Sequence, residues 1–68
     1  MINEEPDIKL QAVYNVSETC AILQVSRGTL RDRRVKGYIV PVNPYDAKGY
    51  RYTGEAIRKL WRFENHLN

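Results

Sequence analysis

Residues 15–37 of the chain read NVSETCAILQVSRGTLRDRRVKG, and we interpret this segment as two short helices joined by a tight turn. Asn15 can cap the first helix, because Glu18 follows at the spacing where cap and carboxylate each satisfy a free backbone N–H group. Ser26 can cap the second helix, and Gly37 can end it in the left-handed conformation. The stretch therefore predicts a helix-turn-helix.

An apolar stripe runs along the first of these helices. Val16, Cys20 and Leu23 recur at intervals of four and three residues, which places them on one face of a helix that extends to about Gln24. Leu30 is the residue of the second helix that we expect to point inward. Cys20 is the only cysteine of the chain and cannot form an internal disulfide, so we interpret it as a buried structural thiol.

The rest of the second helix is polar and mostly basic. A helix with few buried residues and many exposed cations is suited to the major groove of double-stranded DNA. Arginines can donate paired hydrogen bonds to guanine or phosphate, and hydroxyl groups at the helix start can contact phosphate. For Asp32 two interpretations stand side by side: it accepts a hydrogen bond from cytosine, or it orients a neighbouring arginine. The candidate DNA-binding residues of this helix are Ser26, Arg27, Thr29, Arg31, Asp32, Arg34 and Lys36.

The length and composition indicate one small domain. Sixty-eight residues, of which 43% are apolar and 28% charged, form a globular domain too small for a sizeable catalytic cleft. The sequence contains neither a transmembrane run nor a signal-peptide pattern, so we expect a cytoplasmic protein that does not use a membrane. It also contains no nucleophile with a base, no glycine-rich phosphate loop and no metal-ligand cluster. We therefore expect no enzymatic activity and no cofactor.

Charge is distributed unevenly along the chain. The net charge is +3, but residues 1–18 contain four acidic residues and one lysine, a balance of −3. Residues 19–68 contain ten basic and four acidic residues, a balance of +6. The basic part is the part that bears the two-helix motif, as expected for a protein that neutralises phosphates.

The segment before the motif is acidic at its start and more apolar at its end. Residues 1–9 show no periodicity, and we expect a frayed tail there. Residues 10–14 lead into the core as a short strand or an extended segment. The chain is thus divided into an N-terminal tail or arm over 1–13 and a DNA-binding domain over 14–68.

A β-hairpin is predicted behind the second helix. Residues 38–42 are rich in β-forming residues, and Pro41 restricts them to an edge strand. A turn cluster over 43–49 leads to a second short strand over 50–52, and Lys48 lies at the tip. A hairpin directly behind a helix-turn-helix is a wing, which lies beside the DNA backbone or in a minor groove.

The third helix is predicted to begin after Thr53, which can cap it, and Glu55 in its first turn complements the helix dipole. Spacings of three and four residues define its buried face. This face consists of Ile57, Leu60 and Trp61, with Leu67 as a further candidate. The solvated face consists of Arg58, Lys59 and Arg62.

A set of residues in the motif and the predicted hairpin follows a known pattern. These residues are Ser26, Thr29, Leu30, Arg31, Gly37, Tyr38, Ile39, Pro41, Gly49, Tyr50, Arg51 and Tyr52. In order and spacing they resemble the DNA-binding domain of MerR-like regulators and of the related small phage and transposon excisionases, over about residues 14–63. The resemblance implies an α+β, mostly helical winged helix-turn-helix with a two-stranded wing and a C-terminal helix. It places Thr29 and Arg31 on the recognition helix and Arg51 and Tyr52 on the wing, to which Lys48 at the hairpin tip also belongs.

Two residues depart from the family pattern. Gln24 stands where the turn often has glycine, so we expect either a different turn or a left-handed Gln24. Arg33 stands where an aromatic residue usually packs beneath the recognition helix. Either its side chain reaches past the core to a phosphate, which we favour, or its stem replaces the ring in packing.

The resemblance implies DNA binding and leaves several roles open. The first is an excisionase-like architectural factor, or recombination directionality factor, of a phage or mobile element, associated with the bacterial nucleoid or encoded by a phage. Further copies would bind adjacent DNA sites and bend the DNA so that a recombinase (integrase) can assemble. The second is a small MerR-like transcription regulator or repressor. The third, of another class, is a protein-docking or DNA-packaging module of the terminase small-subunit type. The chain lacks the ligand-sensing and coiled-coil segments of full MerR regulators, which favours the first role.

Overall fold

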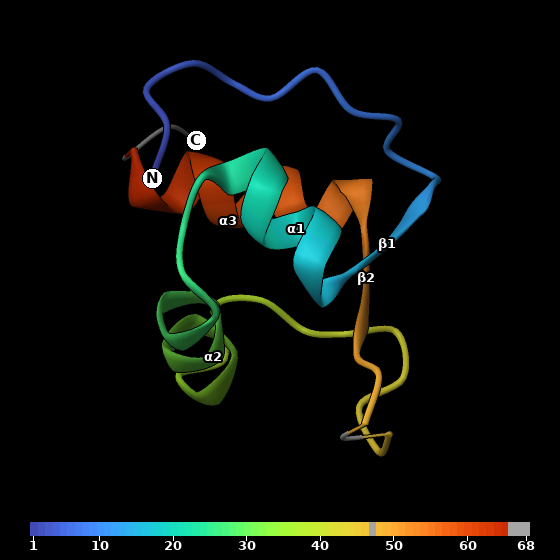
Figure 1. The fold of residues 1–68 in the computed structure, drawn as a ribbon. Helices are drawn as coiled ribbons and strands as arrows, with labels where there is room; N and C mark the ends of the chain where they lie inside the picture. The colour runs from blue at the N-terminus through green and yellow to red at the C-terminus, as the bar shows by residue number, and fades with distance from the viewer. Residues whose placement is uncertain (47, 66–68) are drawn as a thin grey trace.

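The computed structural model describes residues 1–46 and 48–65, and these form three helices and one two-stranded antiparallel sheet. The elements follow the order β1 (Val13–Asn15), α1 (Val16–Leu23), α2 (Arg27–Val35), β2 (Arg51–Thr53) and α3 (Gly54–Glu64) (Figure 1). An α+β fold that contains more helix than strand is thus confirmed. Leu67, a candidate for the buried face of α3, lies outside the described residues. No helix within the described ranges is long and apolar enough to cross a membrane.

Both ends of α1 carry the predicted local contacts. At its start, the Glu18 N–H donates to the Asn15 side chain at 2.7 Å, and the Asn15 N–H donates to the Glu18 carboxylate at 3.0 Å, which completes a capping box. At its end, Gln24 is left-handed, with φ 54° and ψ 51°. The Val25 N–H then reaches back to the Cys20 carbonyl at 3.0 Å. Gln24 therefore occupies a position that favours glycine, which was one of the two expectations for this residue.

The ends of α2 and the start of α3 are also as predicted. Ser26 is the N-cap of α2, and Gly37 follows the helix with a positive φ of 80°. The Tyr38 N–H bonds to the Arg33 carbonyl at 2.9 Å across this glycine, which satisfies a carbonyl that the helix leaves free. Thr53 caps α3 by accepting a backbone N–H group at 3.1 Å.

The two strands come from distant parts of the chain and not from a hairpin. Their register pairs are Val13 with Thr53, Tyr14 with Tyr52 and Asn15 with Arg51. The predicted β-hairpin is therefore wrong in its first strand, because residues 38–42 form no strand. Among the described residues, their one backbone hydrogen bond to β2 runs from the Val42 N–H to the Arg51 carbonyl at 2.8 Å. Pro41 accounts for the difference, since it has no N–H to donate and its ring is buried.

The core lies where the helices meet β2. Among the described residues, its buried hydrophobic side chains are Leu23, Leu30, Ile39, Tyr52, Ile57, Leu60 and Trp61. The inward position of Leu30 and the buried face of α3 are thus confirmed for the described residues. Thr19 is also fully buried, and its hydroxyl is satisfied by donating to the Asn15 carbonyl at 2.8 Å. Cys20 packs against the core but is only half-buried, so the expectation of a buried thiol is met in part.

Residues 1–12 form an arm that passes along α1 and α3, away from α2 (Figure 1). Ile2 and Ile8 pack against the core. The Ile2 N–H donates to the Leu23 carbonyl at 3.2 Å, and the Ile2 carbonyl accepts from the Trp61 indole at 2.9 Å. The expectation of a frayed tail is therefore wrong. The sequence does not indicate that this arm is packed, because isolated apolar residues without periodicity do not show which distant residues they contact.

The acidic side of the arm neutralises part of α3. The Glu5 carboxylate pairs with Arg58 at 2.8 Å and with Arg62 at 3.2 Å. Lys59, between them in sequence, remains exposed. Of the predicted solvated face, two arginines are thus held by the arm and are not free to bind an anion.

The arm also satisfies the start of α3. The Gly54 N–H donates to the Ala12 carbonyl at 2.9 Å, and the Glu55 N–H donates to the Leu10 carbonyl at 3.0 Å. The approach is so close that a Cβ atom on Gly54 would lie 2.1 Å from the Lys9 carbonyl oxygen. Glycine is therefore required at this first position of α3 by space and not by backbone conformation.

Candidate nucleic-acid interface

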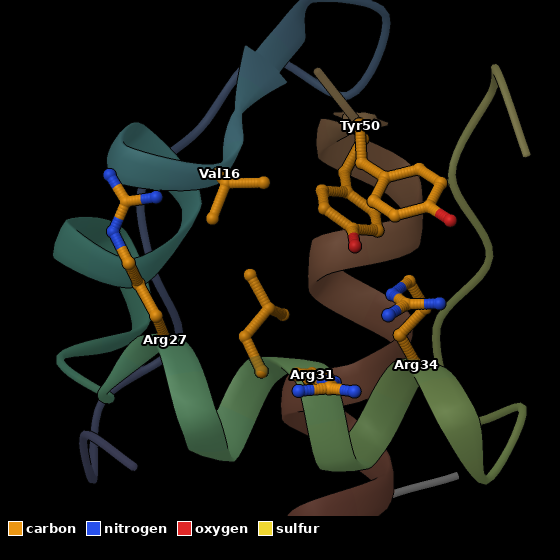
Figure 2. Close-up of a pocket in the computed structure, with 7 residues that line it drawn as sticks. Val16, Arg27, Arg31, Arg34 and Tyr50 are labelled. Carbon is orange, nitrogen blue, oxygen red and sulfur yellow. The ribbon is translucent and has the colours of Figure 1, made fainter. Parts of the chain in front are cut away.

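One face of α2 gathers three arginines around a hollow. Arg27, Arg31 and Arg34 are spaced by four and three residues, so they share a stripe along the helix. They line a hollow of about 410 Å³, and Figure 2 shows Arg27 and Arg34 rising from α2 toward α1 and Tyr50. The remaining lining residues are Val16, Leu30, Tyr50 and Tyr52. The hollow therefore has a cationic rim over an apolar and aromatic floor.

The three arginines differ in what holds them. Arg27 donates a hydrogen bond to the Ser17 hydroxyl of α1. Arg34 lies over the Tyr50 ring, with its guanidinium carbon 4.5 Å from the ring centre. Arg31 is exposed. Within residues 1–46 and 48–65 none of the three forms an ion pair with a carboxylate, so their charge is available to an external anion.

The remaining charges of α2 neutralise one another on a different side of the helix. Asp32 pairs with Lys36 at 3.3 Å and also with Arg33, and Arg33 continues to Glu64 of α3. The hydrogen bond from Lys36, together with the Arg33 guanidinium, holds the pKa of the Asp32 carboxyl below its usual value of 3.8. The hydrogen bond to Glu64 raises the pKa of Arg33.

These pairs decide two interpretations that the sequence left open. Of the alternatives for Asp32, the structure shows the one in which it orients a neighbouring arginine, Arg33. The favoured position of Arg33 at a phosphate is wrong, because its guanidinium is held between Asp32 and Glu64 and ties α2 to α3. Lys36 shares its charge with Asp32 and is the least available cation of the predicted set.

The two hydroxyl residues of the predicted set lie together at the start of α2. The Ser26 hydroxyl accepts the Thr29 N–H at 3.1 Å and donates to the Thr29 hydroxyl at 3.0 Å. Ser26 is exposed and Thr29 is half-buried. Both side chains thus complete the cap first, and any contact with a phosphate would add to that role.

The α2–β2 loop (residues 36–50, with Ala47 outside the described residues) lies beside the arginine stripe. Asn43 holds it closed: its side chain donates to the Gly49 carbonyl and accepts from the Arg51 N–H, both at 2.8 Å. The Asn43 side chain thereby replaces the strand pairing that the sequence predicted. Lys48 and Tyr50 line a second hollow of about 280 Å³ that shares Arg27 with the first. The loop and the arginine stripe therefore border one continuous depression.

Of the three predicted wing residues, two are placed at the surface and one is not. Lys48 and Arg51 are exposed and have no carboxylate partner among the described residues. Tyr52 is only 1% exposed and belongs to the core. Burial raises the pKa of its phenol above 10.0, and the charge of Arg34 opposes that shift. The expected surface contact of Tyr52 is therefore corrected, because β2 turns this ring inward.

Sequence reasoning missed the side chains that position the arginines. The sequence places Tyr50 in a short strand and in the family pattern, and Asn43 in a turn cluster, without a contact to an arginine for either residue. Ser17 and Asn43 gave no signal beyond their residue type, because their partners lie ten and eight residues away. Val35 is 68% exposed on α2, and its position on the outer side of the helix follows from the 100° rotation per residue.

Comparison with known proteins adds no further guide to this site. No model of a protein family matches the chain, and neither a curated protein nor a solved structure matches it significantly. The chemistry of the site is therefore argued from its geometry. Among the described residues, the three guanidinium groups of the stripe, Lys48 of the loop and Arg51 of β2 have no carboxylate partner, and such a group of cations can bind a polyanion through paired hydrogen bonds and charge.

Proposed function

We propose that this protein binds double-stranded DNA in a sequence-specific manner as an excisionase-like architectural factor, through a winged helix-turn-helix. In this arrangement α2 is the recognition helix and the α2–β2 loop is the wing. The observation that carries the proposal is the segregation of charge. Among the described residues, the cations without a carboxylate partner at this depression are Arg27, Arg31, Arg34 and Lys48, and Arg51 of β2 is a fifth exposed cation without such a partner.

The paired cations provide the contrast. Arg33, Arg58 and Arg62 all lie against carboxylates of the chain itself. If the basic residues served only solubility, paired and unpaired cations should be mixed over the surface and not separated onto different faces. Cations held near one another without counter-ions repel, and a DNA backbone would relieve that repulsion while releasing its own counter-ions.

The outer side of α2 is shaped for a close approach. A Cβ atom added to Gly28 would meet nothing closer than the Ser26 hydroxyl at 3.8 Å, so the helix surface is open there. Gly28, Arg31 and Val35 share this side of the helix. Gly28 leaves space for a close approach, Arg31 supplies paired N–H donors, and Val35 supplies an apolar contact. A helix fits the major groove of B-DNA, where arginine can read guanine and an apolar group can contact the thymine methyl.

The resemblance to excisionases and MerR-like regulators supports the architectural role. An excisionase-type factor binds short sites as several copies and bends the DNA so that a recombinase can act, and it needs no catalytic residue. The partners that follow from this proposal are double-stranded DNA, further copies of this chain on adjacent sites, and an integrase.

The test begins with a selection from random-sequence duplexes, followed by electrophoretic shifts at two salt concentrations. If all five free cations contact phosphates, affinity should fall about 500-fold between about 50 and 200 mM salt, since each contact contributes about 0.9 to the logarithmic slope. Circular-permutation shifts on DNA around the nearest recombination attachment site then measure bending. Stepwise complexes with a large bend support the architectural factor.

Two other outcomes select the alternatives. Tight binding at a promoter without bending identifies a small MerR-like regulator or repressor. Salt-insensitive binding, or none, refutes the DNA-binding proposal and favours the protein-docking module, for which the exposed Tyr38–Phe63 ring pair, 4.6 Å between centres, is a starting surface.

A further inference from the structure

Arg34 is held by an aromatic ring rather than by a carboxylate. Its guanidinium carbon lies 4.5 Å from the centre of the Tyr50 ring, inside the range of a cation–π contact. Tyr50 is half-buried and stands on the α2–β2 loop immediately before β2. The stack thus joins the C-terminal half of the arginine stripe to the loop on the other side of the depression.

The ring is itself positioned by the loop. Asn43 bonds to the residues on both sides of Tyr50, accepting from the Arg51 N–H and donating to the Gly49 carbonyl. The Val42 N–H adds a third bond to the Arg51 carbonyl at 2.8 Å. The main chain that carries Tyr50 is therefore pinned on either side, and the ring has a fixed place from which to hold Arg34.

Stacking on Tyr50 leaves the N–H donors at the edge of the Arg34 guanidinium free to bind a ligand. The five N–H donors of a guanidinium lie in its plane, whereas a cation–π contact uses the face. A salt bridge, as at Arg33, occupies those donors instead. A stacked arginine keeps its full charge and its forked donors while losing much of its rotational freedom before it meets a ligand.

We propose that Tyr50 is a positioning residue for sequence selectivity: it holds Arg34 in a fixed direction so that the guanidinium can donate its paired hydrogen bonds to a guanine edge in the major groove. The inference rests on the proposed DNA-binding function and deepens it. Removal of the ring leaves the charge of Arg34 intact, so the electrostatic attraction to any DNA remains. What is lost is the alignment that distinguishes guanine from the other bases.

The experiment compares Tyr50→Leu and Tyr50→Phe on the duplex selected by the wild-type protein and on a random-sequence duplex of the same length. We expect Tyr50→Leu to weaken binding to the selected duplex about 3- to 30-fold, the range of a cation–π contact, with random-duplex affinity unchanged within about twofold. Tyr50→Phe keeps the ring and should retain wild-type selectivity. Tyr50→Phe is thus the matched control, because it removes only the hydroxyl and keeps the ring against which Arg34 stacks.

A double-variant cycle identifies the partner. Arg34→Lys keeps the charge but loses the fork, so it should lower selectivity as Tyr50→Leu does, and the two changes together should cost little more than one. In the free protein, the Arg34 Cδ protons should show an upfield ring-current shift by NMR. That shift should vanish in Tyr50→Leu and persist in Tyr50→Phe.

The outcomes separate the inference from the proposed function. Wild-type protein that binds no duplex in a salt-dependent way overturns the DNA-binding proposal, and the inference with it. Wild-type protein that selects a sequence, combined with unchanged selectivity in Tyr50→Leu, overturns the inference alone. Equal losses on both duplexes, or a Tyr50→Phe variant as impaired as Tyr50→Leu, also overturn it, because they assign Tyr50 a general contact or a hydroxyl contact.

Discussion

Substitution of Gly54 by alanine should destabilise this protein, although alanine is the better helix former. Gly54 is the first residue of α3, and an added Cβ atom would lie 2.1 Å from the Lys9 carbonyl oxygen. Ordinary contact begins at 3.4 Å, so the arm must retreat by about 1.3 Å. The obstacle is a backbone carbonyl, which cannot rotate away as the end of a flexible side chain could.

The magnitude follows from what the arm loses when it retreats. Gly54 and Glu55 donate backbone hydrogen bonds to Ala12 and Leu10, and each bond contributes about 1 kcal/mol. Overpacking of this kind costs about 1 to 3 kcal/mol, while alanine returns at most about 1 kcal/mol of helix propensity. We expect a net loss of about 2 kcal/mol, which lowers the midpoint of thermal unfolding by about 8 to 16 °C in a domain of this size.

The measurement is thermal and urea unfolding followed by circular dichroism, with Gly28→Ala as the matched control. Gly28 is also helical, but its added Cβ atom meets only the Ser26 hydroxyl at 3.8 Å. Gly28→Ala should therefore stabilise the protein by about 0.5 to 1 kcal/mol. A Gly54→Ala variant that unfolds at or above the wild-type midpoint would show that the arm does not lie against α3, and the reasoning would be refuted.

Three further predictions concern the turn, the charges of α2 and the loop. Gln24→Gly should raise the free energy of unfolding by about 1 kcal/mol, because glycine adopts the left-handed backbone at φ 54° without the steric strain of a Cβ atom. Gln24→Ala keeps the Cβ atom and should give no gain. Equal stability of the two variants would contradict the strain at this position. The pKa of Asp32 is lowered on folding, so the stabilising contribution of this carboxylate should be present above pH 3.8, its unfolded pKa, and disappear as the pH falls further. The unfolding midpoints of the wild type and of Asp32→Asn should therefore differ at pH 7 and converge in acid. A difference in midpoint that persists in acid would show that the substitution acts through packing and not through charge. Lys48→Ala should reduce the slope of log affinity for DNA against log salt concentration by about 1. Lys59→Ala, at an exposed lysine of α3, should leave this slope unchanged. Equal slopes for the two variants would show that Lys48 does not contact DNA.

The local signals in the sequence were sufficient for most of the helical structure. Asn15 with Glu18, and Gly37 with its positive φ, are determined by contacts within a few residues, so their spacing alone predicted the capping box and the end of α2. Leu30 followed from helical periodicity, because a single apolar residue on a polar helix has one direction in which to be buried. Arg27, Arg31 and Arg34 were predicted as DNA-binding residues of this helix, but their alignment in one stripe was not predicted.

Predictions failed where a residue had two possible partners far apart in the chain. Residues 38–42 have strand-forming composition, but Pro41 removes one backbone N–H from them, and the pairing of β2 with the distant β1 has no local signal. The family resemblance assigned Tyr52 to the surface, and alternation in a short strand could not correct this, because it does not reveal which face is covered. Arg33 was assigned to a phosphate because Glu64, its partner, is thirty-one residues away.

The helices, their caps and the basic character of α2 are encoded locally, because they depend on interactions between residues three to five positions apart. Only the tertiary structure decided that residues 1–12 pack as an arm, that β1 pairs with β2, and which cations are neutralised. The physical reason is that burial and ion pairing depend on which surfaces meet, and that is set by the whole chain at once. The cationic face at Arg27, Arg31 and Arg34 depends on both: local periodicity aligns the arginines, and among the described residues the fold pairs none of them with a carboxylate.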